Sequence, residues 1–193
     1  VAEITYPRKL DAALKGAGGL TVMAPEKAFK AGWHRKVLGK DLARRVDALL
    51  VDQSPGALGV TVESISDGTP RRLAVALLPD EVSRHNSPSR SEAILKAGRS
   101  SSPPGKTVVL VGIDEADHVE ASLAALARAM PRFSRKSQPK KPGTVAFLAA
   151  DLAGKTIPVS SRAKEIADAL RWAAEMVDTP TAEMTAADLA AAA

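Results

Sequence analysis

The sequence of 193 residues contains no cysteine, and only 3% of its residues are aromatic. The lack of cysteine excludes disulfides, thiolate metal ligands and a cysteine nucleophile. No apolar run approaches the roughly 18 to 20 residues that cross a bilayer, so we expect no membrane partner. Five charged side chains within the first 20 residues interrupt any signal-peptide core. These absences predict a soluble, cytoplasmic protein whose core is built from small aliphatic side chains.

The charge is unevenly divided along the chain. The total is 27 basic and 22 acidic side chains, a formal net charge of +5. Residues 162–193 hold three of the basic and six of the acidic side chains, so residues 1–161 carry +8 and the remainder carries −3. Such asymmetry is typical either of a nucleic-acid-binding surface or of two regions that face different neighbours. Charge alone leaves both interpretations open.

Hydrophobic patterning predicts an α/β protein. Strands are indicated by short β-branched or continuously apolar runs: Glu3–Tyr6, Leu20–Ala24, Leu58–Ile65, Arg72–Leu78, Thr107–Val111 and Thr144–Ala149. Helices are indicated by apolar residues spaced three to four apart: a short one after Pro25 that contains Phe29 and Trp33, then Lys40–Val51, Ser89–Ala97, Asp117–Met130 and Arg162–Val177. Strands that alternate with helices after residue 70 imply parallel pairing, while one hairpin makes the sheet mixed. The expected fold is a three-layer α/β/α sandwich with a mixed sheet of about six strands.

The last part of the sequence reads as an entry into further structure. The long helix is expected to stop at Thr179-Pro180, because a residue before proline is pushed out of the α region. Thr185 is expected to cap a new helix that runs to the final alanines. Since a domain does not naturally end in the first turns of a helix, and Val1 is not an initiator Met, we expect a fragment of a longer polypeptide.

Several segments imitate catalytic motifs without completing them. Gly105-Lys106-Thr107 and Gly154-Lys155-Thr156 resemble the end of a phosphate-binding loop, but both lack its first glycine and are interpreted as turns. Asp114–Asp117 is interpreted as a strand-to-helix loop in which Asp117 caps the helix. No two of the three histidines have zinc-binding spacing, and there is no nucleophile elbow. We therefore expect no catalytic residue and no metal ligand in this chain.

Two basic regions could contact nucleic acid. One lies between two prolines and carries five basic side chains and no acidic one, together with Phe133: Arg132, Arg135, Lys136, Lys140 and Lys141. Such a segment could follow a phosphate backbone, although charged loops are more often simply solvated. The other is Arg35–Arg45, next to Trp33 and His34, where the simpler interpretation is a tryptophan that anchors a helix while the basic side chains face water.

Two segments resemble a known enzyme family. Val82–Ser89, with the sequence VSRHNSPS, is similar to a run in the aminopeptidase-like branch of the M17 peptidases. Ala174–Thr185, with the sequence AEMVDTPTAEMT, closely resembles the junction in M17 leucyl aminopeptidases where a long helix meets a Thr-Pro turn. Asparagine is usual in the family where this chain has Asp178 and Ala182. The residues that match the family motifs are Arg84, His85, Asn86, Ser87, Pro88, Asp178, Thr179 and Pro180.

The resemblance implies the non-catalytic N-terminal domain of a leucyl aminopeptidase, with a macro-domain-like fold and a structural role in a homo-hexamer. It divides the chain into an α/β core at 1–161, a connecting helix and linker at 162–181, and the start of a catalytic domain at 182–193. The family's two divalent metals, zinc or manganese, would lie in that catalytic domain, which is the expected partner. No segment here matches the family's metal signature. Two other functions remain open: a module that binds DNA or other nucleic acid, as in some bacterial members, and a pocket for a nucleotide metabolite formed by Gly16–Gly19.

Overall fold

A seven-stranded mixed sheet organises the molecule. The computed structural model describes residues 2–81, 87–100, 105–133 and 143–192. The strand order is β1-β6-β5-β2-β4-β3, and β7 pairs with β6. The five strands from β1 to β4 in this order run parallel, while β3 and β7 are antiparallel to their neighbours. The strands are β1 (Glu3–Thr5), β2 (Gly19–Pro25), β3 (Val60–Ile65), β4 (Arg72–Leu78), β5 (Lys106–Ile113), β6 (Thr144–Asp151) and β7 (Thr156–Ile157).

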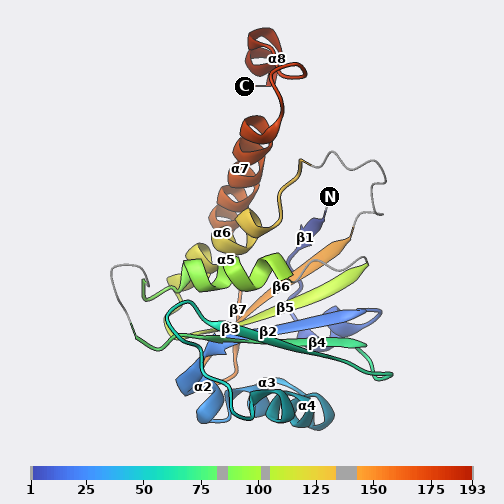
Figure 1. Cartoon of the computed structure of the whole chain (residues 1–193), viewed down its shortest axis with the longest axis vertical. Coiled ribbons are helices and arrows are strands. Elements are labelled where there is room, and N and C mark those ends of the chain that lie inside the picture. The colour runs from blue at the N-terminus through green and yellow to red at the C-terminus, as the bar shows by residue number, and fades with distance from the viewer. Residues whose placement is uncertain (1, 82–86, 101–104, 134–142, 193) are drawn as a thin grey trace.

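Helices cover both faces of the sheet (Figure 1). They are α1 (Leu10–Leu14), α2 (Glu26–Lys30), α3 (Trp33–Val37), α4 (Lys40–Leu50), α5 (Ser91–Ser100), α6 (His118–Ala129), α7 (Ser161–Asp178) and α8 (Ala186–Ala192). Helices α2 to α4 lie on one face, whereas α5 and α6 lie on the other, with α7 packed on α6. The expected three-layer architecture is confirmed. No helix in the described part of the chain is both long enough and apolar enough to cross a membrane.

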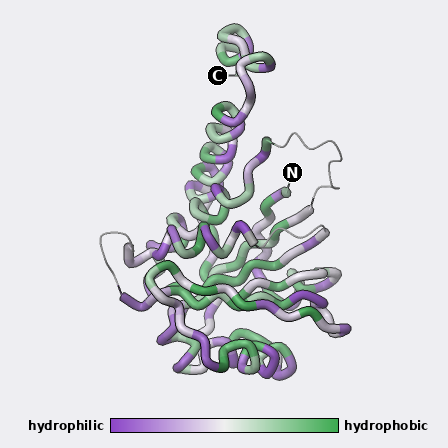
Figure 2. Tube along the Cα trace, viewed as in Figure 1, coloured by the Kyte–Doolittle hydropathy of each residue, from purple (hydrophilic) through white to green (hydrophobic). Residues whose placement is uncertain are grey.

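Two hydrophobic clusters, one on each face, hold the layers together. On one side Trp33, Phe29 and Val46 pack against the strands. On the other, Ile94 and Leu123 do the same from α5 and α6. Figure 2 shows the most hydrophobic stretches running along the central strands, as expected for strands buried on both faces.

The structure corrects several local predictions. The single helix expected after Pro25 is two helices, α2 and α3, separated at Gly32 with a φ of +73°. Asp117 does not cap α6: its backbone is helical, and its side chain makes no capping hydrogen bond. Helix α1 and strand β7 are additional elements, which were missed because five and two residues are too short to show a period. Thr185 caps α8 as expected, since its Oγ1 accepts a hydrogen bond from the Asp188 amide at 3.3 Å.

Candidate functional site

The order of the strands creates a switch point at the carboxyl end of β2. The chain leaves β2 toward β4 on one side, whereas β5, on the other side of β2, leads on to β6. Ligands of open α/β sheets bind in the crevice at such a point. Five charged or titratable side chains from four segments meet there, and we call them the switch-point cluster. They are Lys27, Asp80, Arg90, Asp114 and His118.

Arg90 lies at the centre of the switch-point cluster and is only 5% exposed. Its guanidinium donates to the carbonyl oxygens of Pro79 at 2.6 Å and Pro88 at 2.8 Å. It also makes a bidentate pair with Asp114, at 2.9 and 3.0 Å. The Arg90 backbone has a φ of +54°, a conformation that non-glycine residues seldom adopt. Arg90 therefore fastens Pro79 and Pro88 onto the end of β5, where Asp114 lies.

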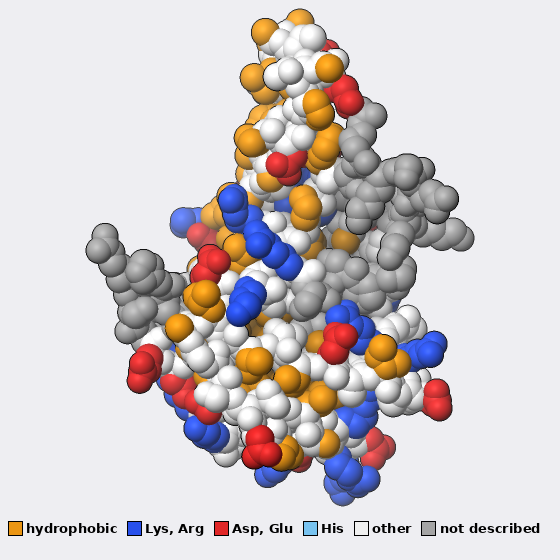
Figure 3. Space-filling view, viewed as in Figure 1, with side chains coloured by type: hydrophobic (Ala, Val, Ile, Leu, Met, Phe, Trp, Pro, Cys, Tyr) orange, Lys and Arg blue, Asp and Glu red, His pale blue; other side chains and the backbone are white. Residues whose placement is uncertain are grey.

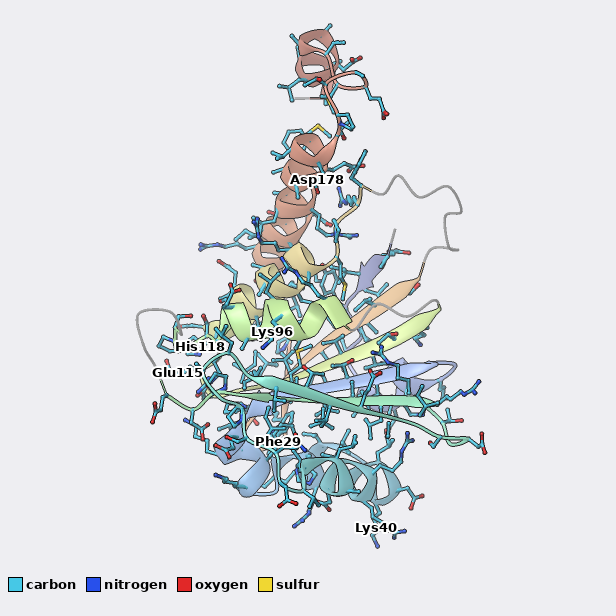
Figure 4. The ribbon with its side chains drawn as sticks, viewed as in Figure 1. Phe29, Lys40, Lys96, Glu115, His118 and Asp178 are labelled. Atoms are coloured by element: carbon cyan, nitrogen blue, oxygen red, sulfur yellow. The ribbon has the colours of Figure 1, made fainter. Side chains whose placement is uncertain are left out.

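Asp114 is held ionised by its neighbours. Lys27 Nζ lies 3.4 Å from it, and His118 Nδ1 lies 3.7 Å away. Burial acts to raise the pKa of Asp114, but the hydrogen bonds and charge of Arg90, with a contribution from Lys27, outweigh burial and hold that pKa below its ordinary value. His118 and Glu115 lie together at this end of the sheet, beside the start of α6 (Figure 4).

The chain's own carboxylates fill the crevice. The Lys27 amide at the start of α2 donates its single N–H to both carboxylate oxygens of Asp80, at 3.1 and 2.9 Å. An amide at a helix start is where a bound anion would otherwise sit. The space left beside Arg90, Asp114 and His118 is only about 10 Å³. Because so small a volume holds at most one water, the switch-point cluster acts as a structural latch rather than as a ligand pocket.

Of the first family-like segment, the structure describes Ser87, Pro88 and Ser89, and the first two of these are exposed beside this latch. The Ser87 hydroxyl lies 2.9 Å from the Ser89 hydroxyl, within the loop that Arg90 fastens. The predicted motif residues Arg84, His85 and Asn86 lie outside the described residues. The pairing of Arg90 with Asp114 was not predictable, because no sequence pattern relates residues that lie 24 positions apart.

The second family-like segment, Asp178-Thr179-Pro180, lies where α7 ends. The Thr179 amide and hydroxyl both donate to the Glu175 carbonyl, at 3.0 and 2.7 Å. Pro180 begins a turn in which its carbonyl accepts from the amides of Glu183 and Met184. Helix α7 therefore stops at the predicted place. The helix starts at Ser161, where Ser160 caps it through a 3.1 Å bond to the Ala163 amide.

The end of α7, together with α8, projects from the body (Figure 1). The buried residues of α7 are Ala163, Ala167 and Arg171, all in its first eleven positions. Arg171 anchors the helix by donating to the carbonyls of Met130 and Ala2. Beyond it no side chain of α7 is buried: Trp172, Ala173 and Val177 are exposed, and Val177 is 85% exposed. Figure 3 shows such side chains over the projecting segment.

An open groove of about 540 Å³ runs beside the exposed part of α7. Apolar side chains of α7 form one wall, while residues from α5, α6 and the segment after α6 form the rest. The lining residues are Arg99, Arg128, Ala129, Pro131, Leu170, Ala173, Ala174, Val177 and Asp178. We call this feature, together with the projecting helix end, the α7 surface.

Comparison with known proteins identifies the family. Residues 43–139 match the family described as M17 aminopeptidase N-terminal domain 2. The chain belongs to this family. It is 40% identical to the probable aminopeptidase NPEPL1 of Homo sapiens and 37% identical to that of Mus musculus, in each case over 117 residues. The match covers 57% of this chain and 22% of those proteins, so the chain spans about a fifth of their length.

Solved structures show the same fold over nearly all of this M17 domain. The leucine aminopeptidase of Caenorhabditis elegans superposes with a TM-score of 0.67 over 99% of this chain and 39% of its own, at 16% identity. The leucyl aminopeptidase of Leishmania major, in complex with actinonin, superposes with a TM-score of 0.66 over 98% of this chain and 38% of its own, at 18% identity. The resemblance inferred from two short segments is therefore confirmed at the level of family and fold.

The basic regions of the M17 domain take part in internal contacts where the structure describes them. Arg132 pairs with Asp168 at 3.0 Å, while Arg135, Lys136, Lys140 and Lys141 lie outside the described residues. On the face in Figure 3, basic and acidic side chains are interspersed over the body. Nothing in these contacts favours a phosphate backbone, and nucleic-acid binding stays an untested prediction.

The second basic region holds α3 and α4 together. Buried His34 lies 2.8 Å from Asp47 through Nε2, and Arg35 donates to the same carboxylate at 2.9 Å. The hydrogen bond from Arg35, with that from His34, holds the pKa of Asp47 below its usual range against the opposing effect of burial. Arg45 donates to the Pro70 carbonyl at 3.0 Å. The interpretation of Trp33 as a helix anchor agrees with its burial, but His34 is buried as well.

The Gly16–Gly19 loop lies at the amino ends of the parallel strands, whereas the switch point lies at their carboxyl ends. It leads into the amino end of β2, and the Gly18 amide donates to the Lys106 carbonyl at 2.9 Å. Ligands of such sheets bind at the carboxyl ends of the strands. Its position thus gives no support to the nucleotide-metabolite pocket considered for this loop.

Metal-binding side chains do not gather in the described part of this M17 domain. Within residues 2–81, 87–100, 105–133 and 143–192, no three His, Asp or Glu side chains are arranged to hold a metal ion. The described residues therefore do not fit a metal centre.

Proposed function

We propose that this domain has an architectural role in a leucyl aminopeptidase of the M17 family and performs none of its chemistry. The observation that carries the proposal is the α7 surface. Exposed apolar side chains that lie together on a projecting helix usually mark an interface. The solved relatives extend well beyond the matched part, since this chain covers 39% and 38% of their lengths. The occupant that we propose for the α7 surface is the catalytic domain of the same polypeptide.

In this proposal the three parts of the chain have different tasks. Residues 1–161 form the α/β core, residues 162–181 form the connecting helix and linker, and residues 182–193 begin the catalytic domain. An 18-residue helix is about 27 Å long, and Arg171, its eleventh residue, fixes it to the core. The connection is therefore a rigid strut rather than a flexible tether. The two zinc or manganese ions would belong to the catalytic domain, and the parent enzyme would be a cytoplasmic homo-hexamer.

The chain by itself is expected to hydrolyse no peptide bond. Purified protein would be incubated with leucine p-nitroanilide and added manganese or zinc, and release of p-nitroaniline would be followed. No metal-dependent release above the buffer rate is expected, because the described residues do not bring together groups that could activate a metal-bound water. Turnover that is abolished by a chelator would contradict the proposed absence of chemistry.

Val177→Asp tests whether Val177 lies at the proposed domain interface or is simply exposed to solvent. In this chain alone the change is expected to alter the free energy of unfolding by less than about 0.5 kcal/mol, since Val177 is 85% exposed. In the full-length enzyme, a charge at the domain interface is expected to lower the thermal midpoint by about 5 °C.

Val51→Asp is the matched control, because Val51 is 62% exposed at the end of α4, away from the α7 surface. Val51→Asp should change neither the free energy of unfolding of this chain nor the thermal midpoint of the full-length enzyme. Equal midpoints for the Val177→Asp and Val51→Asp forms of the full-length enzyme would refute the proposed interface. Differential scanning calorimetry of both proteins provides the measurement.

A further inference from the structure

A notch interrupts the outer edge of β6. This edge pairs with β1 through Thr144–Ala146 and with β7 through Ala149 and Ala150. Phe147 and Leu148 lie between the two pairings. Pro7 follows β1 and has no N–H, so β1 cannot continue the ladder across the gap. The sheet therefore leaves an opening two residues long, bordered by the ends of two short strands.

The notch opens into a cavity of about 310 Å³, which we call the edge pocket. A cavity of this size lies at the small end of the range for small-molecule sites. Its apolar floor is formed by Ile157 of β7 and Val159, which are both half-buried. Phe147 and Leu148 line it only at the β6 edge, because their side chains are buried in the two cores. Its polar groups include Tyr6 and Arg8 from the segment after β1, and Lys164 from α7. The edge pocket thus combines an apolar floor with a polar rim.

The charge of the edge pocket has one sign. Arg8 and Lys164 line it, and no aspartate or glutamate does. Among the described residues, neither cation forms an ion pair; Lys164 Nζ instead lies 5.2 Å from the centre of the Tyr6 ring. The acidic side chain that acts on Tyr6 is Asp168, which is already paired with Arg132 at 3.0 Å. Two positive charges therefore face the cavity without a protein counter-ion from the described residues.

Tyr6 adds a neutral donor beside these charges. Burial, followed by the charge of Asp168, raises the pKa of the Tyr6 phenol above its ordinary value. The hydroxyl therefore remains protonated at neutral pH and is able to donate a hydrogen bond. Two cations and a phenol around an apolar floor match a ligand with an oxyanion at one end and an apolar group at the other.

We propose that the edge pocket binds a small organic anion, in which a carboxylate or phosphate group faces Arg8 and Lys164 and an apolar body packs against Ile157 and Val159. The site differs from the switch-point cluster, which its own side chains fill, and from the α7 surface. It does not depend on the architectural role proposed above.

Calorimetric titration of the chain tests the proposal with four probes: benzoate, phenyl phosphate, inorganic phosphate and phenol. Benzoate carries a carboxylate and phenyl phosphate carries a phosphate, so these two probes distinguish the two oxyanions. Inorganic phosphate lacks the apolar body, and phenol lacks the negative charge. Saturable binding of at least one of the first two is expected, with inorganic phosphate and phenol binding more weakly. Lys164→Gln is expected to weaken that binding about tenfold, since it removes one charge-assisted contact.

Lys155→Gln is the matched control, because Lys155 is exposed in the β6–β7 turn and does not line the edge pocket. It removes the same charge from the chain and should leave the affinity unchanged. If both substitutions weakened the affinity for the organic anion equally, the effect would come from the net charge of the chain, and the proposal would be overturned. So would the absence of saturable binding of both organic anions up to about 10 mM. Inorganic phosphate that binds as tightly as phenyl phosphate would refute the role of the apolar floor.

Discussion

Trp33→Ala is expected to lower the free energy of unfolding by about 4 kcal/mol, the cost of truncating a large aromatic side chain in a core. Trp33 is 1% exposed and is the largest fully buried side chain described. It packs edge-on against Phe29, with ring centres 6.1 Å apart, and its indole N–H donates to the Asp151 carbonyl at 2.8 Å. A Cβ at Gly112 would lie 2.9 Å from the Trp33 ring, so the absence of a side chain there makes room for the indole.

Urea denaturation followed by circular dichroism measures this loss. Trp172→Ala, at the chain's other tryptophan, is the control: its side chain is 39% exposed on α7, and its removal should cost less than about 1 kcal/mol. Trp33→Phe keeps a ring but loses the hydrogen bond to Asp151, so it should fall between the wild type and Trp33→Ala and remain measurable if the alanine variant does not fold. Equal losses for Trp33→Ala and Trp172→Ala would contradict the assigned anchor role.

The succession of strands and helices along the chain was largely predictable from local patterns. Arg72–Leu78 matched a strand in both position and burial, because a run of aliphatic residues between two turns has few other stable arrangements. The hairpin of β3 and β4 followed from the short turn between them. The capping role of Asp117 was wrong, since residue type alone does not show whether the backbone at that position is extended or already helical.

The switch-point cluster was not predictable, because tertiary geometry creates it. Arg90 was expected to lie inside a helix that begins at Ser89, yet its positive φ delays the start of α5 to Ser91. That conformation turns the guanidinium back toward Asp114, which the sequence presented only as part of an incomplete motif. The M17 junction at Thr179-Pro180 was easier to predict, since the proline effect is local. Local rules predict where elements stop, but not which distant side chains meet.

Asp114→Ala is expected to lower the free energy of unfolding by about 3 kcal/mol, the cost of leaving one partner of a buried ion pair uncompensated. Arg90, only 5% exposed, would keep its two carbonyl contacts but lose its counter-ion. For a domain of this size, the thermal midpoint should fall on the order of 10 °C. Asp117→Ala is the control three residues away, because Asp117 makes no capping hydrogen bond and should change stability by less than about 0.5 kcal/mol. If Asp114→Ala and Asp117→Ala lowered the free energy of unfolding by similar amounts, the Arg90–Asp114 pair would not act as a structural latch.

Comparison of the wild type with Asp114→Asn tests how the stability contributed by the same latch depends on pH. The folded-state pKa of Asp114 lies below the value of about 3.9 for an unfolded chain, because the hydrogen bonds and charge of Arg90 outweigh burial. The stability contributed by the ionised carboxylate is therefore complete above that unfolded pKa and is lost as the pH falls through the lower folded pKa. The wild type should exceed Asp114→Asn in free energy of unfolding at about pH 6, and the difference should shrink toward pH 3. Denaturation of both proteins is measured at several pH values, and the contributions of the other titrating groups cancel in the difference between their free energies of unfolding. If this difference stayed constant between about pH 6 and pH 3, the Arg90–Asp114 pair would not depend on the charge of Asp114.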